Sequence, residues 1–336
     1  MNDYQKRKRS QIITLSILLL LSVLFGVLSL FVGRYPKAGF TAPSLFFHDS
    51  IAQTILINIR LPRIVLALAA GAMLASSGFT FQLLFANPLV EPGFLGVSQG
   101  AAFGAAAVIV FTNATSLAVQ ISAMVFGLLG LLFSYLLAKR FRFGGALLRL
   151  VLAGIAVSAL FSSALGVIKL VAEPTKDLQD ITFWMMGGLW NASWRSIIPT
   201  LVVITVALII LYLNRFTLNL LSINEKTSFS LGLNPKRQRM ILLFVATVGT
   251  TFTISVTGLI GWVGLITPHI ARKTFGSEAT FSLPASMIMG SFFLLLCDSL
   301  GRTVLPTEIP IGLLTSFFGA IIFVVILSSK SQEGKA

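Results

Sequence analysis

Apolar runs separated by short polar breaks recur along the whole chain. Most runs reach the ~18 residues expected of a membrane-spanning helix, and they predict ten spans, of which the eighth is short. The predicted ranges are 11–32, 61–85, 94–111, 117–138, 147–171, 194–213, 240–257, 259–271, 281–301 and 310–328. We therefore expect an all-α polytopic membrane protein, with residues 1–336 forming a single transmembrane domain that includes a polar tail at 1–10 and a polar segment at 214–239.

The composition agrees with a membrane protein. Hydrophobic residues make up 56% of the 336 residues and charged residues only 11%, against about 25% charged residues in soluble domains. The first apolar run follows a basic cluster, which also describes a secretory signal. However, it is longer than the apolar part of a typical signal, and Arg34-Tyr35-Pro36 does not fit a small-residue cleavage site. We therefore interpret it as the first span.

Basic residues are unevenly divided between the two sides that the spans define. If the amino terminus is cytoplasmic, 17 Lys and Arg residues lie inside and 8 lie outside. The positive-inside rule then predicts that both termini are cytoplasmic. The same bias accounts for most of the net charge of +14, so this charge does not indicate nucleic-acid binding.

The chain lacks the motifs that build catalytic or nucleotide-binding sites, such as GxxxxGK[ST], HExxH and CxxC. Cys297 lies alone in an apolar run, and His48 and His269 have no metal-ligand spacing. We expect no enzyme activity, no metal site and no cofactor bound by this chain; if ATP and Mg²⁺ are used, another chain must bind them. Acidic residues fall at span ends or in loops, which disfavours a proton-coupled transporter but leaves sodium coordination by carbonyl groups open.

Arg60 and Arg63 lie three residues apart at the predicted outer start of the second span. Pro62 between them fits the first helical turn, where proline is tolerated. Cations are unfavourable at a helix amino terminus by roughly 0.3–1 kcal/mol each, so these charges need an explanation. Either they reach lipid headgroups or they await carboxylates of an external partner. Arg302 fits the same outer patch, although Asp298 is placed four residues earlier to pair with it.

Small residues repeat at every fourth position in two spans, which allows helix backbones to approach closely. Tight packing inside the subunit is the simpler interpretation of both stripes, whereas the serines of the second stripe also suit a pathway wall. The stripes are Gly96, Gly100 and Gly104 in the third span, and Gly154, Ser158, Ser162 and Gly166 in the fifth.

Three connections between spans carry distinct signals. The second and third spans share a hinge at Asn87-Pro88 and Glu91-Pro92-Gly93. Between the fifth and sixth spans, tryptophans suit an outer interfacial belt, and aromatic groups at a pathway mouth also suit substrate contact. In the inner segment 214–239, a short helix over 224–231 is predicted to end at Gly232 and Asn234-Pro235. This segment is either a solvated loop or a docking element for a cytoplasmic partner.

The sequence resembles the FecCD-like permease subunits of type II ATP-binding-cassette (ABC) importers for iron–siderophore chelates, haem and vitamin B12. The resemblance covers nearly the whole chain, with several long motifs in the order of the family. These are RLPR, NPLVEPGFLGVSQGAAFGA, LLRLVLAG, FWMMGGL, SINEKTSFSLGLN, GLIGWVGLITPHIAR and LPTEIPIG.

The resemblance implies a ten-helix permease of the bacterial cytoplasmic membrane that dimerises with a second permease around a central pathway. It further implies two cytoplasmic ATPase subunits and an external substrate-binding protein whose glutamates dock onto Arg60, Arg63 and Arg302. The family's coupling helix matches Asn224 to Asn234. Within it the resemblance points to Asn224, Glu225, Ser228, Leu231, Gly232 and Asn234.

Relatives also place a cytoplasmic gate at the turn that matches Asn87 and Leu89. Together with Pro88, Pro92 and Gly93 this turn is the predicted gate and hinge. A second gate at the start of the fifth span carries small hydroxyl residues in the vitamin B12 permease, where this chain has 146–148 as Ala-Leu-Leu. This departure does not match a polar second gate and argues against vitamin B12 as cargo. The resemblance as a whole points to a large iron chelate, a ferric siderophore, with haem or cobalamin as alternatives within the family. An ion-coupled secondary transporter is the alternative from another class.

Overall fold

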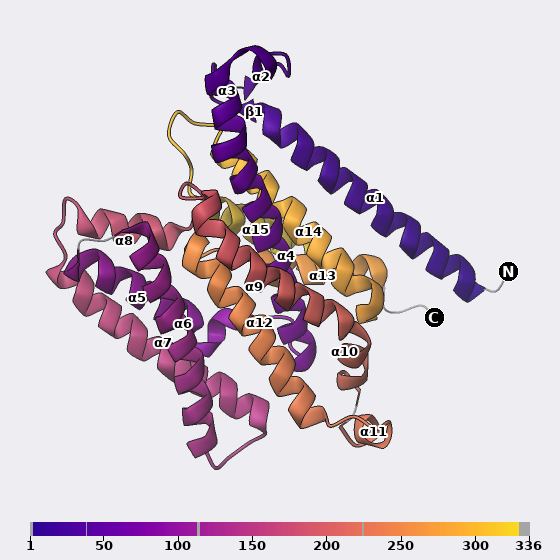
Figure 1. Cartoon of the computed structure of the whole chain (residues 1–336). Coiled ribbons are helices and arrows are strands. Elements are labelled where there is room, and N and C mark those ends of the chain that lie inside the picture. Colours follow the sequence, from indigo (N-terminus) through magenta and orange to yellow (C-terminus); the bar gives the residue numbers. More distant parts are fainter. Residues whose placement is uncertain (1–2, 38, 113–114, 224, 329–336) are drawn as a thin grey trace.

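The computed structural model describes residues 3–37, 39–112, 115–223 and 225–328, and it is almost entirely helical (Figure 1). Its long helices are α1 (Asp3–Phe31), α4 (Leu61–Leu84), α5 (Val97–Phe111), α6 (Ser116–Arg140), α7 (Ala146–Val171), α9 (Trp194–Leu213), α12 (Pro235–Thr257), α13 (Val263–Phe275), α14 (Ala279–Gly301) and α15 (Ile311–Ser328). Shorter elements are β1 (Val32–Gly33), β2 (Gly39–Phe40), α2 (Leu45–His48), α3 (Ser50–Ile55), a π-helical turn η1 (Leu56–Arg60), a 3₁₀ turn η2 (Pro92–Leu95), α8 (Asp177–Met186), α10 (Arg215–Leu221) and α11 (Glu225–Ser230).

Each of the ten predicted spans coincides with a helix, which confirms the polytopic helical fold. Within the described residues, seven helices are long and apolar enough to cross a membrane, and α5 and α15 are shorter apolar helices. The predicted short eighth span is α13, which has 13 residues. We call the face at which α1 begins the N face and the opposite one the far face.

The second span begins earlier than the sequence predicted, and this prediction was wrong. Helix runs without a break from Ser50 to Leu84, over 35 residues. The turn η1 ends two residues before Pro62, which has no backbone N–H and whose ring crowds the carbonyl of the preceding turn. Widening that turn to a π-helical one accommodates the ring without ending the helix. Arg60 and Arg63 therefore lie within a continuous helix, and the helix-end argument for their charges does not apply.

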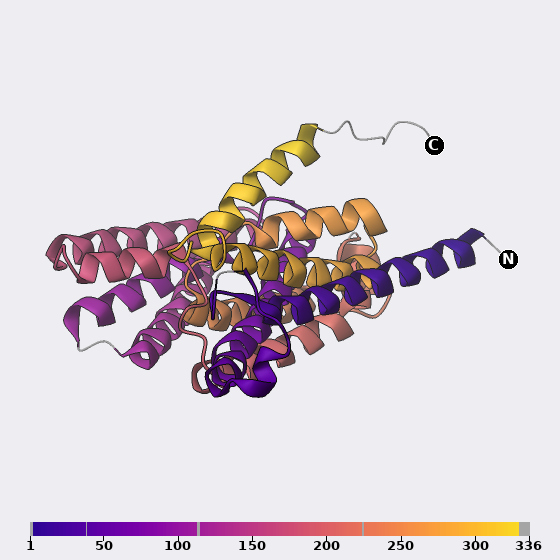
Figure 2. The ribbon, with the colours of Figure 1, turned by 90° about the horizontal axis from the view of Figure 1, so that it is seen from above.

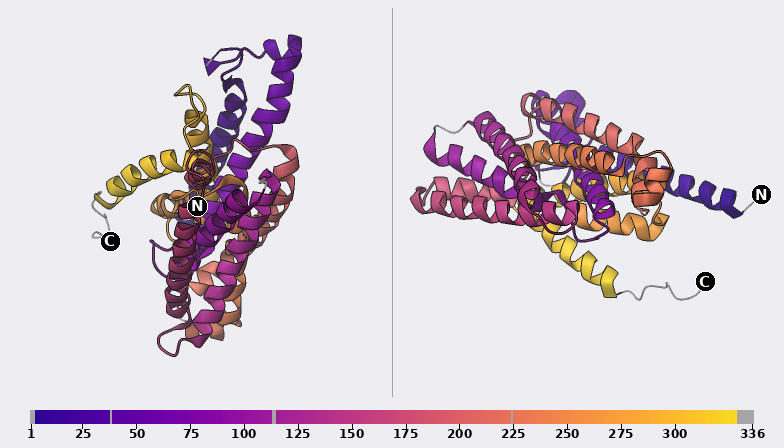
Figure 3. Two further views of the ribbon diagram at one scale, coloured as in Figure 1. Left: turned by 90° about the vertical axis from the view of Figure 1, so that its left-hand side faces the viewer. Right: turned by 90° about the horizontal axis from the view of Figure 1, so that it is seen from below.

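The extended second span carries a small subdomain beyond the far face. Figures 1 and 3 both show α2 and α3 standing clear of the ends of the neighbouring helices. The strands β1 and β2 pair antiparallel beside them, with Val32 opposite Phe40. Asp49 caps α3 by accepting from the backbone N–H of Ile51 at 2.8 Å, and it also accepts from the hydroxyl of Tyr35 at 2.6 Å.

Helix α4 occupies the centre of the bundle, and its contacts depend on residues without side chains. A Cβ atom on Gly71 would lie 2.2 Å from the carbonyl oxygen of Gly290 in α14, and one on Gly78 would lie 1.9 Å from that of Gly264 in α13. Lipid gives no hydrophobic drive for helix association, so such close backbone contacts hold the helices together. The predicted packing role of the first stripe is likewise confirmed, because Gly100 and Gly104 contact the backbone of α6.

Non-helical backbone interrupts the bundle between α12 and α13. Gly258 and Trp262 both have positive φ angles there, +67° and +71°. The Gly187 turn after α8 packs against this segment: Gly188 N–H donates to the carbonyl of Thr257 at 2.8 Å, and Ile311 N–H donates to that of Gly187 at 2.9 Å. Irregular backbone at this depth is tolerated because protein groups rather than lipid surround it.

We predict that Gly78→Val destabilises the protein by about 1–3 kcal/mol or more, because the new side chain would overlap the backbone of α13. Gly166→Val is the matched control, since an added Cβ at Gly166 meets no atom within 4 Å. Thermal unfolding of the purified protein in detergent measures both. Equal melting temperatures for the two variants would show that the α4–α13 contact is not a close backbone contact.

Candidate functional site

The far face holds a cluster of buried charges in which Arg63 has a central place. Its Nε atom donates to Oδ1 of Asp298 in α14 at 2.7 Å, and its Nη1 atom lies 3.0 Å from Oε2 of Glu308 in the α14–α15 loop. The side chain of Arg63 is 8% exposed, and that of Asp298 is fully buried. This ion pair therefore ties α4 to α14 and to the loop that leads into α15.

Arg302 adds a second cation to the same cluster. Its Nε atom lies 3.5 Å from Oδ2 of Asp298, which confirms the pairing predicted from their spacing of four residues. Its guanidinium also donates to the carbonyls of Val32 and Ser29, each at 2.7 Å. Arg302 thus links the end of α14 to the end of α1.

Arg60 is held by uncharged groups. It donates to the carbonyls of Leu30 at 2.8 Å and of Tyr35 at 3.2 Å, and its guanidinium lies 5.7 Å from the ring centroid of Phe46. The close approach requires glycine at position 33, where a Cβ atom would lie 2.5 Å from Arg60 Nη2. Arg60 therefore fastens the far-face subdomain onto the bundle.

The three predicted docking arginines are thus not free cations at a helix end. All are buried, with exposed fractions of 5% for Arg60 and 7% each for Arg63 and Arg302. Each guanidinium donates to acceptors inside the chain, although Nε of Arg302 makes no hydrogen bond. The sequence predicts two alternatives for these arginines: that they reach lipid headgroups, or that they remain without a counter-charge until an external partner binds. Their burial and internal contacts correct both. Sequence spacing could not show it, because the acceptors lie up to 273 residues away in the chain. Their docking role stays a prediction.

The predicted hinge lies at the N face, between α4 and α5. Asn87, Pro88 and Leu89 are exposed, and the Asn87 side chain accepts from the backbone N–H of Leu89 at 2.9 Å. Pro92 is buried and Gly93 half-buried where the chain turns into η2. The break itself is confirmed, whereas its role as a gate stays a prediction.

A polar contact missed by the sequence reasoning fixes this turn to α13. Arg272 in α13 donates to the side-chain oxygen of Gln82 near the end of α4, and the Gln82 amide donates to the carbonyl of Gly264 at 3.0 Å. The Arg272 guanidinium also lies 5.3 Å from the ring centroid of Phe79. A cavity of about 530 Å³ separates Gln82, Asn87 and Pro88 on one side from Asn219 and Ser222 of the α10 region on the other.

The segment 214–239 forms the elements α10 and α11 at the N face. The predicted short helix is confirmed over Glu225–Ser230, and Gly232 ends it with φ +86°. Asn224 lies outside the described residues. Ser228 is buried and donates to the carbonyl of Leu220 at 2.5 Å, and Asn234 caps α12 by accepting from Arg237 N–H.

Four large apolar side chains of this segment are exposed among its described residues, and the two most exposed lie in and just after α11. Phe229 is 69% exposed and Leu231 is 59% exposed. Phe229 and Glu225 line a cavity of about 530 Å³, together with Asn234 and Pro235. An exposed apolar pair rimmed by polar residues is typical of a protein-docking site.

The second small-residue stripe divides into two parts. Gly154 packs tightly, because a Cβ atom there would lie 2.2 Å from the carbonyl oxygen of Phe94. Ser158 is half-buried, and Ser162 and Gly166 are exposed. In the far-face half of α7 the stripe therefore lies on the exposed side of the helix, whereas Leu165 and Ile168 on its other side are buried. Only Gly154 follows the tight-packing interpretation.

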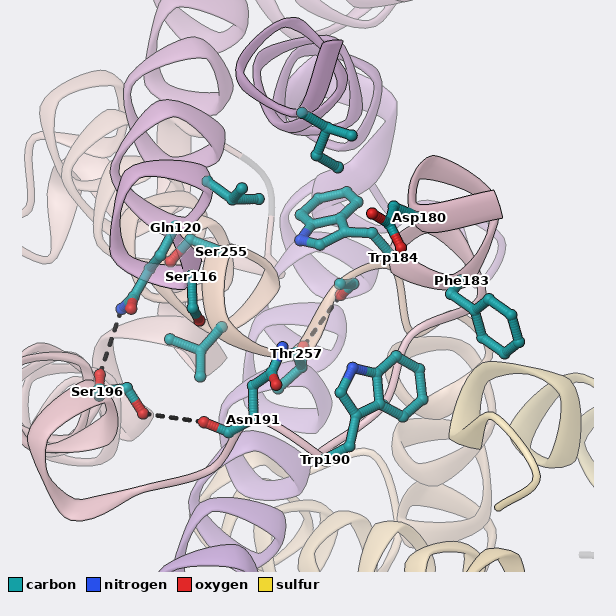
Figure 4. Close-up of a pocket in the computed structure, with 15 residues that line it drawn as sticks. Ser116, Gln120, Asp180, Phe183, Trp184, Trp190, Asn191, Ser196, Ser255 and Thr257 are labelled. Carbon is teal, nitrogen blue, oxygen red and sulfur yellow. Dashed lines mark hydrogen bonds between the residues drawn. The ribbon is translucent and has the colours of Figure 1, made fainter. Parts of the chain in front are cut away.

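A pocket of about 260 Å³ near the far face was also missed by the sequence reasoning (Figure 4). Trp184, Trp190 and Asp180 line one side, and Figure 4 shows Gln120 and Ser196 on the opposite side. Gln120 donates to the carbonyl of Ser196 at 3.3 Å, which joins α6 to α9. Trp184 and Trp190 therefore border a pocket lined by both polar and apolar groups, and their place in an outer interfacial belt stays a prediction. Among the described residues, no group of three His, Cys, Asp or Glu side chains is placed to hold a metal.

Comparison with known proteins identifies the family. The FecCD transport family matches residues 17–329, and the chain belongs to this family of membrane permeases. It is 37% identical over 314 residues to an iron chelatin transport system permease protein of Helicobacter pylori, covering 93% of this chain and 94% of the relative. It is 34% identical over 324 residues to a molybdate import system permease protein of Haemophilus influenzae, covering 94% and 96%.

A solved structure supports the same assignment. It is described as an inward-facing metal-chelate type ABC transporter, is 34% identical to this chain and superposes with a TM-score of 0.86. The match covers 94% of this chain and 98% of that one. The resemblance noted in the sequence and the permease fold are thereby confirmed.

We predict that Asp298→Asn destabilises the protein by about 3–5 kcal/mol, because it leaves the buried Arg63 and Arg302 without their shared counter-charge. Glu308→Gln removes the other carboxylate on Arg63, but this side chain is 38% exposed. Its loss should therefore cost no more than about 1 kcal/mol. Thermal unfolding in detergent compares the two, and a larger loss for Glu308→Gln would contradict the arrangement of the cluster.

Proposed function

We propose that this chain is the permease subunit of an ABC importer that carries a ferric siderophore across the bacterial cytoplasmic membrane. The observation that carries the proposal is the whole-length match, in sequence and fold, to a metal-chelate type ABC transporter. The iron chelatin permease of Helicobacter pylori supports the same cargo class. Haem and cobalamin are the alternative cargoes within the family. The relative named as a molybdate permease adds an oxyanion as a further alternative.

The N face is cytoplasmic in this proposal, and so are both termini. The basic residues of α1 and of the loops at the N face support this orientation, because positive charge is retained on the cytoplasmic side. The far-face subdomain then stands outside the membrane, where an external substrate-binding protein reaches it.

The element α11 is the docking site for a cytoplasmic ATPase subunit. Its exposed Phe229 and the adjacent Leu231 supply the apolar contact, and Glu225 supplies charge at the start of the helix. Two such ATPase subunits serve a dimer of permeases, and they bind the ATP and Mg²⁺. This chain contributes no catalytic group.

Docking of the binding protein at the far face involves Arg63 most directly. Glu308, the partially exposed partner of Arg63, occupies the position that a carboxylate of the binding protein would take. An incoming carboxylate therefore exchanges with Glu308 instead of meeting an unpaired cation. Arg60 and Arg302 support that surface through their carbonyl contacts.

Transport follows alternating access between two packed arrangements, which ligands bias by binding one of them more tightly. ATP binding in the partner subunits moves α10 and α11. The Asn219 side chain accepts from Ala279 N–H at 2.6 Å, so this motion reaches the start of α14. Asn87 and Pro88 lie across the N-face cavity from Asn219. The turn that contains them forms the inner gate when it closes. The exposed Ser162 and Gly166 of α7 then line the pathway between two permeases.

We predict that Phe229→Ser weakens association with the ATPase subunit at least about tenfold, because an exposed aromatic anchor is removed from the contact. The permease should keep its melting temperature, since the side chain is 69% exposed. Phe143→Ser is the matched control, because Phe143 is 58% exposed in another N-face loop. Co-purification and titration with the ATPase measure the effect, and equal affinities for both variants would remove α11 from the docking site.

A further inference from the structure

An apolar pocket lies between four helices that come from both ends of the chain. It has a volume of about 250 Å³ and lies between α1, α13, α14 and α15. In Figure 2, α15 diverges from α13 and α14. The lining is almost wholly apolar, and the hydroxyl of Thr267 is already bonded to the carbonyl of Val263 at 2.6 Å. The lining includes Leu18 of α1, Ile266 of α13, Met289 of α14 and Ile322 of α15.

A basic cluster lies at the N-face end of the same helices. Lys6, Arg7, Lys8 and Arg9 are exposed in the first turns of α1, and Lys273 is exposed near the end of α13. Arg272 does not belong to this cluster, because it points toward Gln82 and Phe79 on the other side of α13.

Direct contacts join the two basic segments. The Gln11 amide donates to the carbonyl of Phe275 at 2.8 Å, and Arg7 Nη2 lies 3.5 Å from the position of a Cβ atom on Gly276. Above them, Leu15 and Leu18 pack against the cluster that contains Phe275. The basic ends of α1 and α13 therefore form one surface directly at the N-face end of the pocket.

The depth of the pocket matches one leaflet of a bilayer. Leu18 follows Arg9 by nine residues and Ile266 precedes Lys273 by seven, which correspond to roughly 14 and 10 Å of helix. One leaflet contributes about half of the ~30 Å hydrocarbon core. An acyl chain whose headgroup lies at the basic surface thus ends in the pocket.

We infer that this junction is a binding site for an anionic phospholipid of the cytoplasmic leaflet. The phosphate lies against Arg7, its basic neighbours on α1 and Lys273, and one acyl chain fills the pocket. Juxtamembrane basic clusters attract anionic lipids, and the apolar pocket adds selection for a molecule with a chain. The inference rests on the proposed orientation, but it is independent of the cargo.

The acyl chain of the lipid packs between α15 on one side and α1 and α13 on the other. Its tail contacts Ile322 of α15 as well as Leu18 and Ile266, so it supports α15 where this helix diverges from the bundle. A lipid bound here sets the distance between α15 and the rest of its own subunit. This distance matters for transport because the predicted pathway runs between two permeases.

The test is native mass spectrometry of the delipidated permease dimer titrated with phosphatidylglycerol or phosphatidylethanolamine. We expect tighter binding of phosphatidylglycerol. Arg7→Gln should lower that affinity about fivefold while leaving phosphatidylethanolamine binding unchanged. Ile322→Trp, which fills the pocket, should weaken both lipids. Soluble glycerol phosphate should not displace the bound lipid, because it lacks the chain.

Two matched variants separate this site from general lipid contact. Arg140→Gln removes an exposed N-face arginine at the end of α6, and Ile321→Trp places the same bulk on the neighbouring, 49%-exposed position of α15. Both should bind phosphatidylglycerol like the wild type. Equal affinities for the two lipids, full displacement by glycerol phosphate, or no difference between each variant and its control would overturn the inference. The inference would also be overturned if the single subunit bound the lipid but the dimer did not. The second permease would then cover this face.

Discussion

The close backbone contacts of α4 are the constraint on which the rest of the structure depends. Helices in lipid gain nothing from hiding apolar surface, so they associate where small residues allow their backbones to meet. Gly71 meets Gly290 and Gly78 meets Gly264 in this way, which fixes α14 and α13 on either side of α4. These two contacts set how closely α14 and α13 approach α4.

Because α4 is held along its length, its two ends are mechanically connected. Arg63 near the far face joins Asp298 and Glu308, and Gln82 near the N face joins Arg272 and Gly264. Both contacts lie on one continuous helix, with the close-packed glycines between them. The charge cluster and the N-face turn are therefore joined by one continuous, closely packed helix.

The sequence was sufficient for the spans, their order, the small-residue packing of Gly100 and Gly104 and the short helix of segment 225–230, because these depend on local composition and periodicity. It was insufficient for the arginines. Whether Arg60 is buried depends on carbonyls of α1 that only the fold brings near it. Pro62 in the sequence does not show whether it begins a helix or lies inside one that has widened to a π-helical turn. Gln82 was missed for the same reason: a lone glutamine in an apolar run shows no pattern until Arg272 faces it.

The most direct test of the account is uptake into proteoliposomes that contain the permease, its ATPase and the external binding protein. We expect accumulation of a ferric siderophore labelled with radioactive iron only when ATP is present on the ATPase side, and none from the permease alone. Accumulation by the permease alone under a proton or sodium gradient would contradict the account, because it would make this chain a secondary transporter.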